Sequence, residues 1–226
     1  MKTTSCMKMY RFIEWFAIKR QLRNTLISLP LAMKYHHGQK RDGGDPYVIH
    51  PYRVCITLIL LRPEFAFRRA YPKKTERWIW RRCDVLFSTA LLHDVLEDVS
   101  LPRKGKELVK NYHLEREVLK NIRILTKPPK TKRMFLSSLQ TKMYYRKIYH
   151  ALIPSLAKPA DRKDNCRTFG VFDTVRKRKY IIETYEYIYP LCKEAKRKYP
   201  EFAQIFDKLM SLIEESIKPY EYLLTG

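Results

Sequence analysis

Apolar residues recur at three- and four-residue spacing along almost the whole chain, and this periodicity constrains the fold more than any other feature. Near the C-terminus it runs over residues 202–217, with Pro200 where a helix can begin and Pro219 where it should stop. The same spacing predicts a helix over residues 9–27 and another through residues 86–96. No convincing run of alternating strand residues competes with it. We therefore predict an all-α protein.

The composition indicates a chain that can build an apolar core. Of the 226 residues, 45% are hydrophobic and 13% aromatic, which is too much for a disordered basic tail. Six glycines argue against a turn-rich β fold, and no GxGxxG or GxxxxGK[ST] phosphate loop occurs. The length suits one domain, so we predict a single domain over residues 1–226.

Several compartments and partners are disfavoured. The longest apolar runs, such as residues 57–61, are far too short to span a bilayer, and the N-terminal residues lack the apolar stretch of a secretory signal. The five cysteines are odd in number and contain no CxxC, which favours buried free thiols over disulfides or a zinc ribbon. We expect a cytoplasmic protein with no membrane partner.

The charge balance points to an anionic partner. Lysines and arginines number 46 against 23 acids, which gives a formal charge of +23. Such a charge attracts nucleotides, nucleic acid or acidic membranes, and it does not choose between a small nucleotide and an RNA. The alternative is a solvated basic surface that merely discourages self-association. Residues 62–82 mix arginine with tryptophan, which fits either a surface hairpin of helices or an RNA-facing arm.

Ionisable residues concentrate in three segments, at 36–51, 91–99 and 158–168. If residues 91–99 form one helix, His93 and Asp94 are neighbours about 100° apart around its axis. Glu97 and Asp98 then lie one turn further along the same face. Four such groups among apolar neighbours are costly to desolvate unless they bind a cation or reach solvent in a cleft.

Each piece also has an ordinary structural interpretation. His50 alone could be a hydrogen-bonded core histidine, and Asp161 alone could cap a helix. The acids at 94, 97 and 98 could form a solvated face. A histidine, a His-Asp pair and a distant aspartate, all in helical context, form a more specific pattern than any of these alone.

Four motifs carry a family resemblance. They are H-G-Q-x-R from His37, P-Y-x-x-H-P from Pro46, L-L-H-D-x-x-E-D from Leu91 and A-D-R-x-x-N-x-R-T from Ala160. In order and spacing they resemble the HD-domain metal phosphohydrolases, and more narrowly the hydrolase domain of RelA/SpoT-type alarmone enzymes. The resemblance covers about residues 33–168 and implies an all-helical HD-domain bundle, continued by helices over residues 174–220. The chain looks like a small, hydrolase-only member.

The resemblance implies one Mn²⁺ ion per chain. Its ligands by motif would be His50, His93, Asp94 and Asp161. Two imidazoles and two carboxylates suit Mn²⁺, although zinc would accept them too. Glu97 and Asp98 match a pair that positions or deprotonates the attacking water.

The substrate implied is guanosine tetra- or pentaphosphate, (p)ppGpp. Water attacks at the 3′ side and releases pyrophosphate with GDP or GTP. Arg41 matches a position that packs against the guanine, and Asn165 and Thr168 match positions lining the nucleoside pocket. Tyr47 is expected to form a wall of the same pocket. A guanidinium can stack on a purine, and an amide can read its edge.

Three functions follow. The first is a Mn²⁺-dependent guanosine-3′,5′-bis(diphosphate) 3′-pyrophosphohydrolase acting on (p)ppGpp or its adenine analogue (p)ppApp, and acting as the antitoxin to a toxic alarmone synthetase. The second keeps this chemistry but removes pyrophosphate from the 3′ end of tRNA, which the +23 charge favours. The third is a non-catalytic, basic helical nucleic-acid-binding module. The sequence does not predict an oligomeric state.

Overall fold

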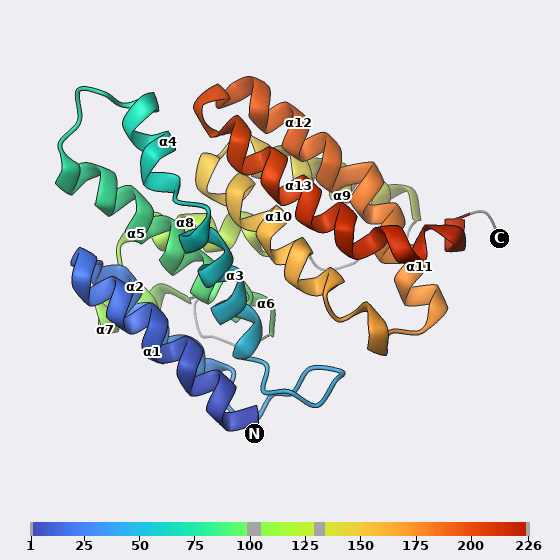
Figure 1. Ribbon diagram of the computed structural model, residues 1–226, viewed down its shortest axis with the longest axis horizontal. Coiled ribbons are helices and arrows are strands. Elements are labelled where there is room, and N and C mark those ends of the chain that lie inside the picture. The colour runs from blue at the N-terminus through green and yellow to red at the C-terminus, as the bar shows by residue number, and fades with distance from the viewer. Residues whose placement is uncertain (1, 99–104, 129–133, 225–226) are drawn as a thin grey trace. The chain divides into compact units, whose positions relative to one another are not determined.

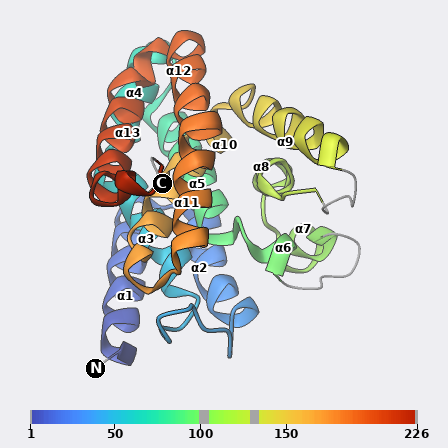
Figure 2. The same ribbon diagram turned by 90° about the vertical axis from the view of Figure 1, so that its right-hand side faces the viewer.

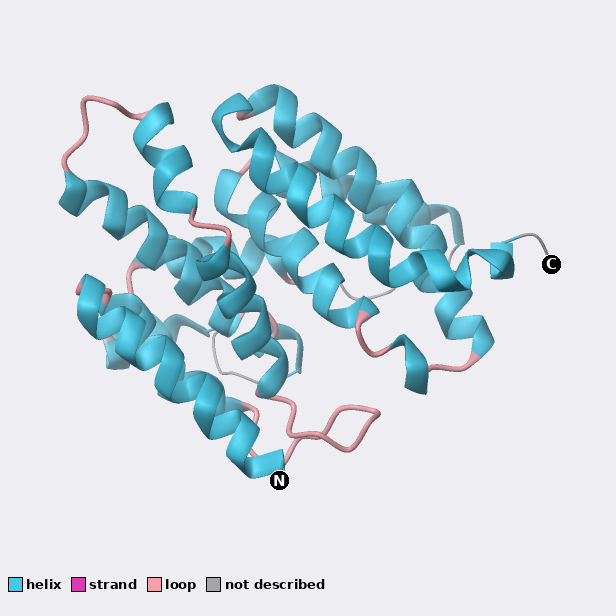
Figure 3. Cartoon of the chain, viewed as in Figure 1, coloured by secondary structure: helices cyan, strands magenta, loops and turns pink. Residues whose placement is uncertain are grey.

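The computed structural model describes residues 2–98, 105–128 and 134–224, with the backbone alone at 2–4, 98 and 134–137. Within these residues the regular structure is helical, apart from an isolated β-bridge between Lys40 and Pro46 (Figures 1 and 3). The predicted all-α class is confirmed. The chain forms two compact units, unit 1 (Met1–Thr126) and unit 2 (Lys127–Gly226). The assignment of residues 1–226 to a single domain stays a prediction.

Unit 1 is built around one helix, α5. Its helices are α1 (Lys2–Arg20), α2 (Arg23–Tyr35), α3 (Ile49–Leu60), α4 (Pro63–Ala70), α5 (Glu76–Leu92), α6 (Val95–Asp98), α7 (Lys106–Tyr112) and α8 (Arg116–Leu125). Helix α5 packs against α2, α3, α4 and α8, while α1 packs against α2 and α3. From Cys83 to Leu92 every residue of α5 is buried. A helix that is buried all round sits in a core, so this half of α5 forms the centre of unit 1.

The basic segment 62–82 forms a helical hairpin made of α4 and the start of α5. Thr75 caps α5 by accepting a hydrogen bond from the backbone N–H of Trp78. Arg68 forms two hydrogen bonds with Glu76 across the hairpin, at 2.7 and 2.8 Å. Trp78 and Trp80 are half-buried, as the hairpin interpretation expects. The alternative role as an RNA-facing arm stays a prediction.

The expectation of one helix over residues 9–27 is wrong. Helix α1 ends at Arg20, and Gln21 takes a left-handed conformation with φ +56° before α2 begins at Arg23. The break has a tertiary cause, because α2 is capped by a residue far along the chain. The Asp84 side chain on α5 accepts hydrogen bonds from the backbone N–H groups of Asn24 and Thr25, at 2.8 and 2.7 Å.

Asp84 thus accepts hydrogen bonds from the first backbone N–H groups of α2, which a local N-cap residue would otherwise do. It also accepts from the Asn24 amide at 3.0 Å and the Thr25 hydroxyl at 2.7 Å, and it is only 4% exposed. The first N–H groups of a helix have no partner within the helix, and a carboxylate there also interacts favourably with the helix dipole. The Asn24 side chain in turn pairs with Glu115, beside the start of α8, which links three helices.

We expect Asp84→Ala to lower the free energy of unfolding by about 2–3 kcal/mol, because buried N–H groups lose a charged acceptor. Urea denaturation measures this. The matched control is Asp173→Ala, which removes an exposed local cap that accepts from the Arg176 N–H at 2.7 Å and should cost about 1 kcal/mol. Equal losses for the two variants would contradict the role given to Asp84.

Unit 2 is a bundle centred on α10. Its elements are α9 (Met134–Tyr149), α10 (Leu152–Cys166), a 3₁₀ turn (Phe169–Val171), α11 (Thr174–Glu183), a π-helical turn (Thr184–Ile188), α12 (Tyr189–Lys198), a 3₁₀ turn (Pro200–Phe202), α13 (Ala203–Ile217) and a 3₁₀ segment (Lys218–Leu224). Helix α10 packs against α9, α12 and α13 (Figure 2). The predicted C-terminal helix is confirmed as α13. None of the described helices has the length and apolarity that crossing a bilayer requires.

The five cysteines are free and buried, as predicted. Burial raises the pKa of the Cys166 and Cys192 thiols to about 12, so both stay protonated at neutral pH. They act as small core residues rather than as nucleophiles.

Candidate metal centre

His93 and Asp94 lie in a turn between two helices. Helix α5 ends at Leu92 and α6 begins at Val95, so the prediction of one continuous helix through residues 91–99 is wrong. The Ala90 carbonyl, which a continuing helix would offer to a backbone N–H, is contacted by Nδ1 of His93 at 2.8 Å. The turn is closed by the Glu97 N–H, which donates to the Asp94 carbonyl at 2.9 Å.

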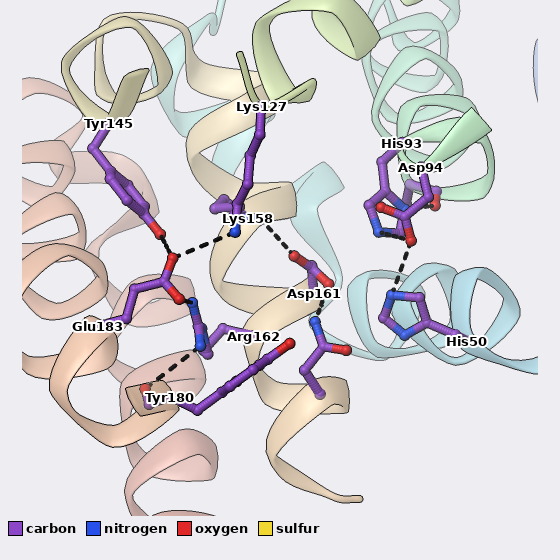
Figure 4. A network of polar contacts seen from close by, with 12 residues as sticks. His50, His93, Asp94, Lys127, Tyr145, Lys158, Asp161, Arg162, Tyr180 and Glu183 are labelled. Carbon is purple, nitrogen blue, oxygen red and sulfur yellow. Dashed lines mark hydrogen bonds and ion pairs between the residues drawn. The ribbon is translucent and has the colours of Figure 1, made fainter. Parts of the chain in front are cut away.

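The turn brings His93 and Asp94 to His50, which lies in the first turn of α3 (Figure 4). Oδ2 of Asp94 lies 3.1 Å from Nε2 of His93 and 3.4 Å from Nε2 of His50. One candidate ligand atom from each residue falls within 4.8 Å of the others. The histidine side chains are 1% and 5% exposed and the Asp94 side chain 17%. Three of the four residues predicted as ligands therefore converge in unit 1.

The chemistry of this donor set fits a divalent metal ion. Nδ1 of His93 lies against a backbone carbonyl, and its Nε2 faces Asp94. Burial alone would raise the pKa of Asp94, but His93 and His50 beside it hold that pKa well below its usual range. Two imidazole nitrogens around one ionised carboxylate suit Mn²⁺ or Zn²⁺. The set forms a possible metal site, and its geometry does not select the metal.

Two predicted nucleoside-binding residues lie beside this cluster. The Tyr47 hydroxyl donates to Oδ2 of Asp94 at 2.8 Å, and its ring stacks on buried His36 with centroids 4.7 Å apart. The guanidinium of half-buried Arg41 lies 5.8 Å from the Tyr47 ring centroid. Tyr47 therefore contacts the candidate ligand Asp94 directly, in addition to its predicted position in a pocket wall.

The two predicted catalytic acids follow on α6. The Glu97 side chain is exposed, and its backbone is tied to Asp94 by the hydrogen bond of the turn. The backbone of Asp98 ends α6, but its side chain lies outside the described residues. The roles of both acids stay predictions.

Asp161 and Asn165 lie on α10 of unit 2 and form a second cluster with Thr168, which follows the end of that helix; Figure 4 shows the position of Asp161. The Asn165 amide donates to Oδ1 of Asp161 at 2.6 Å, and the Thr168 hydroxyl donates to the Asn165 carbonyl at 2.9 Å. Asp161 is 6% exposed. The predicted fourth ligand and two predicted nucleoside-binding residues are thus neighbours, and their predicted roles stay predictions.

Sequence reasoning missed Lys158, which lies one helical turn before Asp161. Its ammonium donates to Oδ2 of Asp161 at 2.8 Å. Burial would lower the pKa of Lys158, but Asp161 and the neighbouring Tyr144 and Tyr145 raise it well above its usual range, so the ammonium stays charged. The spacing of three residues between Lys158 and Asp161 on a helix could have predicted this pair.

An ionic cluster around buried Arg162, also missed, adjoins these residues within unit 2. Glu183 accepts from Arg162 at 2.8 Å, from Tyr145 at 2.7 Å and from Lys127 at 3.4 Å (Figure 4). Lys127, Tyr145 and Glu183 line a cavity of about 1070 Å³. The remaining wall includes cationic and aromatic side chains, among them Tyr144, Arg176, Arg178, Lys179, Tyr180 and Tyr187.

Comparison with known proteins places these features in a family context. No protein-family model matches the chain. It is 29% identical over 168 residues to a guanosine-3′,5′-bis(diphosphate) 3′-pyrophosphohydrolase of Vibrio cholerae, covering 73% of this chain and 20% of that protein. A protein of the same description from Aquifex aeolicus is 30% identical over 211 residues, 85% of this chain and 26% of that protein. The bifunctional (p)ppGpp synthase/hydrolase SpoT of Escherichia coli K12 is 25% identical over 185 residues, 80% of this chain and 23% of that protein.

The fold and the His/Asp cluster define an all-α helical bundle of the HD-domain type. The chain is a distant homologue of the RelA/SpoT-type (p)ppGpp hydrolases, and it spans about a fifth to a quarter of the length of these relatives. The buried donor set is a possible metal site in a chain that is homologous to these proteins.

Proposed function

We propose that this chain is a Mn²⁺-dependent 3′-pyrophosphohydrolase of (p)ppGpp or (p)ppApp. The observation that carries the proposal is the convergence of His50, His93 and Asp94 in a chain related to (p)ppGpp hydrolases. We further propose that Asp161 completes the ligand set and that the protein acts as the antitoxin to a toxic alarmone synthetase.

In this mechanism His50, His93 and Asp94 would hold Mn²⁺, which would lower the pKa of the attacking water toward neutrality. Glu97, with Asp98, orients that water and accepts its proton on a carboxylate oxygen. The water oxygen bonds to the phosphorus next to the nucleoside, and the bond from that phosphorus to the 3′ oxygen breaks. The products are pyrophosphate and GDP or GTP, and the 3′ oxygen takes up the proton that Glu97 accepted from the water.

The substrate class is supported by side chains that suit a phosphorylated purine. Arg41 and Tyr47 present a guanidinium and an aromatic ring beside the His50 cluster. In unit 2, the cavity lined by Arg176, Arg178 and several tyrosines combines charges for phosphates with flat surfaces for a base. We propose that Asn165 and Thr168 contact the nucleoside.

The direct test is incubation of the purified chain with Mn²⁺ and ppGpp, followed by assay of pyrophosphate and GDP. Parallel reactions contain pppGpp, ppApp and tRNA carrying a 3′ pyrophosphate. We expect pyrophosphate from an alarmone, and no product after chelation with EDTA until Mn²⁺ is restored. Cleavage of the tRNA but of no alarmone would show that the substrate is RNA. The absence of any product in every reaction would overturn the proposal and favour a non-catalytic nucleic-acid-binding module.

Glu97→Gln is expected to keep the metal but to lower kcat by ~10²–10⁴-fold, the usual contribution of a general base. The amide is similar in size and cannot accept the proton. Steady-state kinetics and Mn²⁺ titration of the same preparation separate the two effects. The control is Glu107→Gln, which changes another carboxylate of unit 1 and should leave kcat unchanged. Normal turnover by Glu97→Gln would show that this residue is not the base.

A further inference from the structure

The outer face of α1 carries large apolar side chains in solvent. Met7, Phe12, Trp15 and Ile18 are 39%, 36%, 53% and 61% exposed. The opposite face of the same helix is the buried one, where Cys6, Ile13 and Ala17 lie at 7% exposure or less. Helix α1 is therefore apolar on both sides, although only one side packs against α2 and α3 (Figure 1).

This outer face differs from an ordinary solvated helix surface. On α8 the exposed positions are Arg116, Lys120 and Arg123, all of them charged. Scattered exposed apolar residues are normal, but a contiguous group on one helix face indicates an interaction site. Residues 7, 11, 15 and 18 are spaced by four, four and three, so they form one row along the helix.

The same face is positively charged. Lys8, Arg11 and Lys19 are exposed between the apolar side chains, and Lys19 lies 5.0 Å from the Trp15 ring centroid. Among the described side chains of α1, Glu14 is the one acid, and it is half-buried. Apolar and cationic side chains are therefore mixed on this side of the helix. We call it the α1 outer face, and it consists of Met7, Lys8, Arg11, Phe12, Trp15, Ile18 and Lys19.

We propose that the α1 outer face binds the surface of an anionic lipid membrane. Helices that lie at a bilayer interface combine Trp, Phe and aliphatic side chains, which enter the headgroup–acyl boundary, with Lys and Arg that contact lipid phosphates. The formal charge of +23 draws the chain toward such a surface. The sequence-based expectation of no membrane partner rested on the lack of a spanning segment, which peripheral binding does not need.

Other occupants fit this face less well. A second copy of the chain would bring two cationic faces together. An RNA would pair with the lysines and Arg11, but the most exposed side chain is the aliphatic Ile18, which neither stacks on a base nor contacts a phosphate. The Trp15 ring is already contacted by Lys19 and by Phe12, whose centroid lies 6.4 Å away. A lipid surface uses all seven residues.

The test is co-sedimentation of the full chain with vesicles of phosphatidylcholine, or of equal parts phosphatidylcholine and phosphatidylglycerol. We expect binding to the mixed vesicles that weakens as salt is raised. Lys8→Gln, Arg11→Gln and Lys19→Gln combined should weaken it on the order of 10²-fold. The combination Trp15→Ala and Ile18→Ala should weaken it at least about 10-fold through lost apolar burial.

Matched controls distinguish binding through the α1 outer face from attraction that depends only on the net charge of the chain. Lys73→Gln, Lys110→Gln and Lys120→Gln remove the same charge from other exposed sites of unit 1 and should weaken binding far less. Leu60→Ala truncates an exposed apolar residue, 67% exposed, on α3 and should have no effect. Vesicles should also shift the tryptophan emission to the blue in the wild type but not in Trp15→Phe, which keeps Trp78 and Trp80.

Three outcomes would overturn the proposal. The first is equal binding of the wild type to neutral and anionic vesicles. The second is that the Trp15/Ile18 variant loses a dimer and not vesicle binding. The third is that the wild type does not bind vesicles while the charge variant loses affinity for tRNA. Circular dichroism of each variant shows whether it is folded. Alarmone hydrolysis is measured on the same proteins, and it should not change, because no residue of this face belongs to the proposed active site.

Discussion

Asp94→Asn is expected to abolish metal binding at the His50 cluster and to reduce pyrophosphate release by about 10³-fold or more, because a bound metal contributes several kcal/mol to such reactions. Asp94 is the centre of the cluster, since both Nε2 atoms and the Tyr47 hydroxyl lie within 3.4 Å of its Oδ2. The amide keeps the size of the side chain but removes its charge. Mn²⁺ binding measured by calorimetry, together with the pyrophosphate assay, checks both parts.

Two companion variants sharpen this result. Tyr47→Phe keeps the stacking on His36 but removes the hydroxyl that donates to Asp94, and it should weaken metal affinity by about 10–100-fold. Asp42→Asn removes an exposed carboxylate from the same loop and should leave affinity unchanged. Unaltered Mn²⁺ binding by Asp94→Asn would exclude the cluster as the metal site, whatever its effect on turnover.

Glu183→Gln is expected to destabilise the protein by about 3–5 kcal/mol, because it leaves the Arg162 guanidinium buried without its counter-charge. Arg162 is 3% exposed and lies 2.8 Å from Glu183. Far-UV circular dichroism in urea measures the loss, since the helices of both units contribute to it. Replacing both partners, with Arg162→Met and Glu183→Leu, should restore much of the stability, because no buried guanidinium is left without a counter-charge and the Lys127 side chain, 47% exposed, reaches solvent.

The same residue gives the stability a pH dependence. Burial would raise the pKa of Glu183, but Arg162 and Lys127 hold it well below its usual range. The stability that ionised Glu183 contributes is therefore fully present above its unfolded-state pKa of about 4.3. It is lost as the pH falls through the lower pKa that Glu183 has in the folded protein.

The Glu183→Gln variant should lack this part of the acid dependence. The exposed pair Glu194–Arg197 is the control, and Glu194→Gln should cost less than about 1 kcal/mol. An unfolding free energy for Glu183→Gln equal to that of the wild type would show that the ionic cluster is not structural.

The helical class could be predicted from the sequence because periodicity is a local property. The helix ends could not be predicted in the same way. The expected N-terminal helix breaks at Gln21 because Asp84 caps the next helix at Asn24, from which it is 60 residues away. His93 ends α5 through its own ring, which contacts the Ala90 carbonyl. Both breaks depend on side-chain contacts that apolar spacing does not encode.

The candidate site was predictable to the extent that motifs carry it. His50, His93 and Asp94 were predicted as ligands from the family motifs that contain them, and the structure brings them together. Lys158 and Glu183 were missed because no motif marks them, and their importance comes from the partners they meet after folding. Tyr47 was expected in a pocket wall, and its hydrogen bond to Asp94 depends on how the chain folds.

The long-range cap of α2 has a consequence for biosynthesis. The ribosome makes Asn24 and Thr25 well before Asp84, which lies about 60 residues later. At usual elongation rates this interval lasts about 3–12 s. During that time the nascent N-terminal third has no acceptor for the start of its second helix. We expect it to stay protease-sensitive in stalled ribosome complexes until the codon for Asp84 has been translated and the side chain has left the exit tunnel.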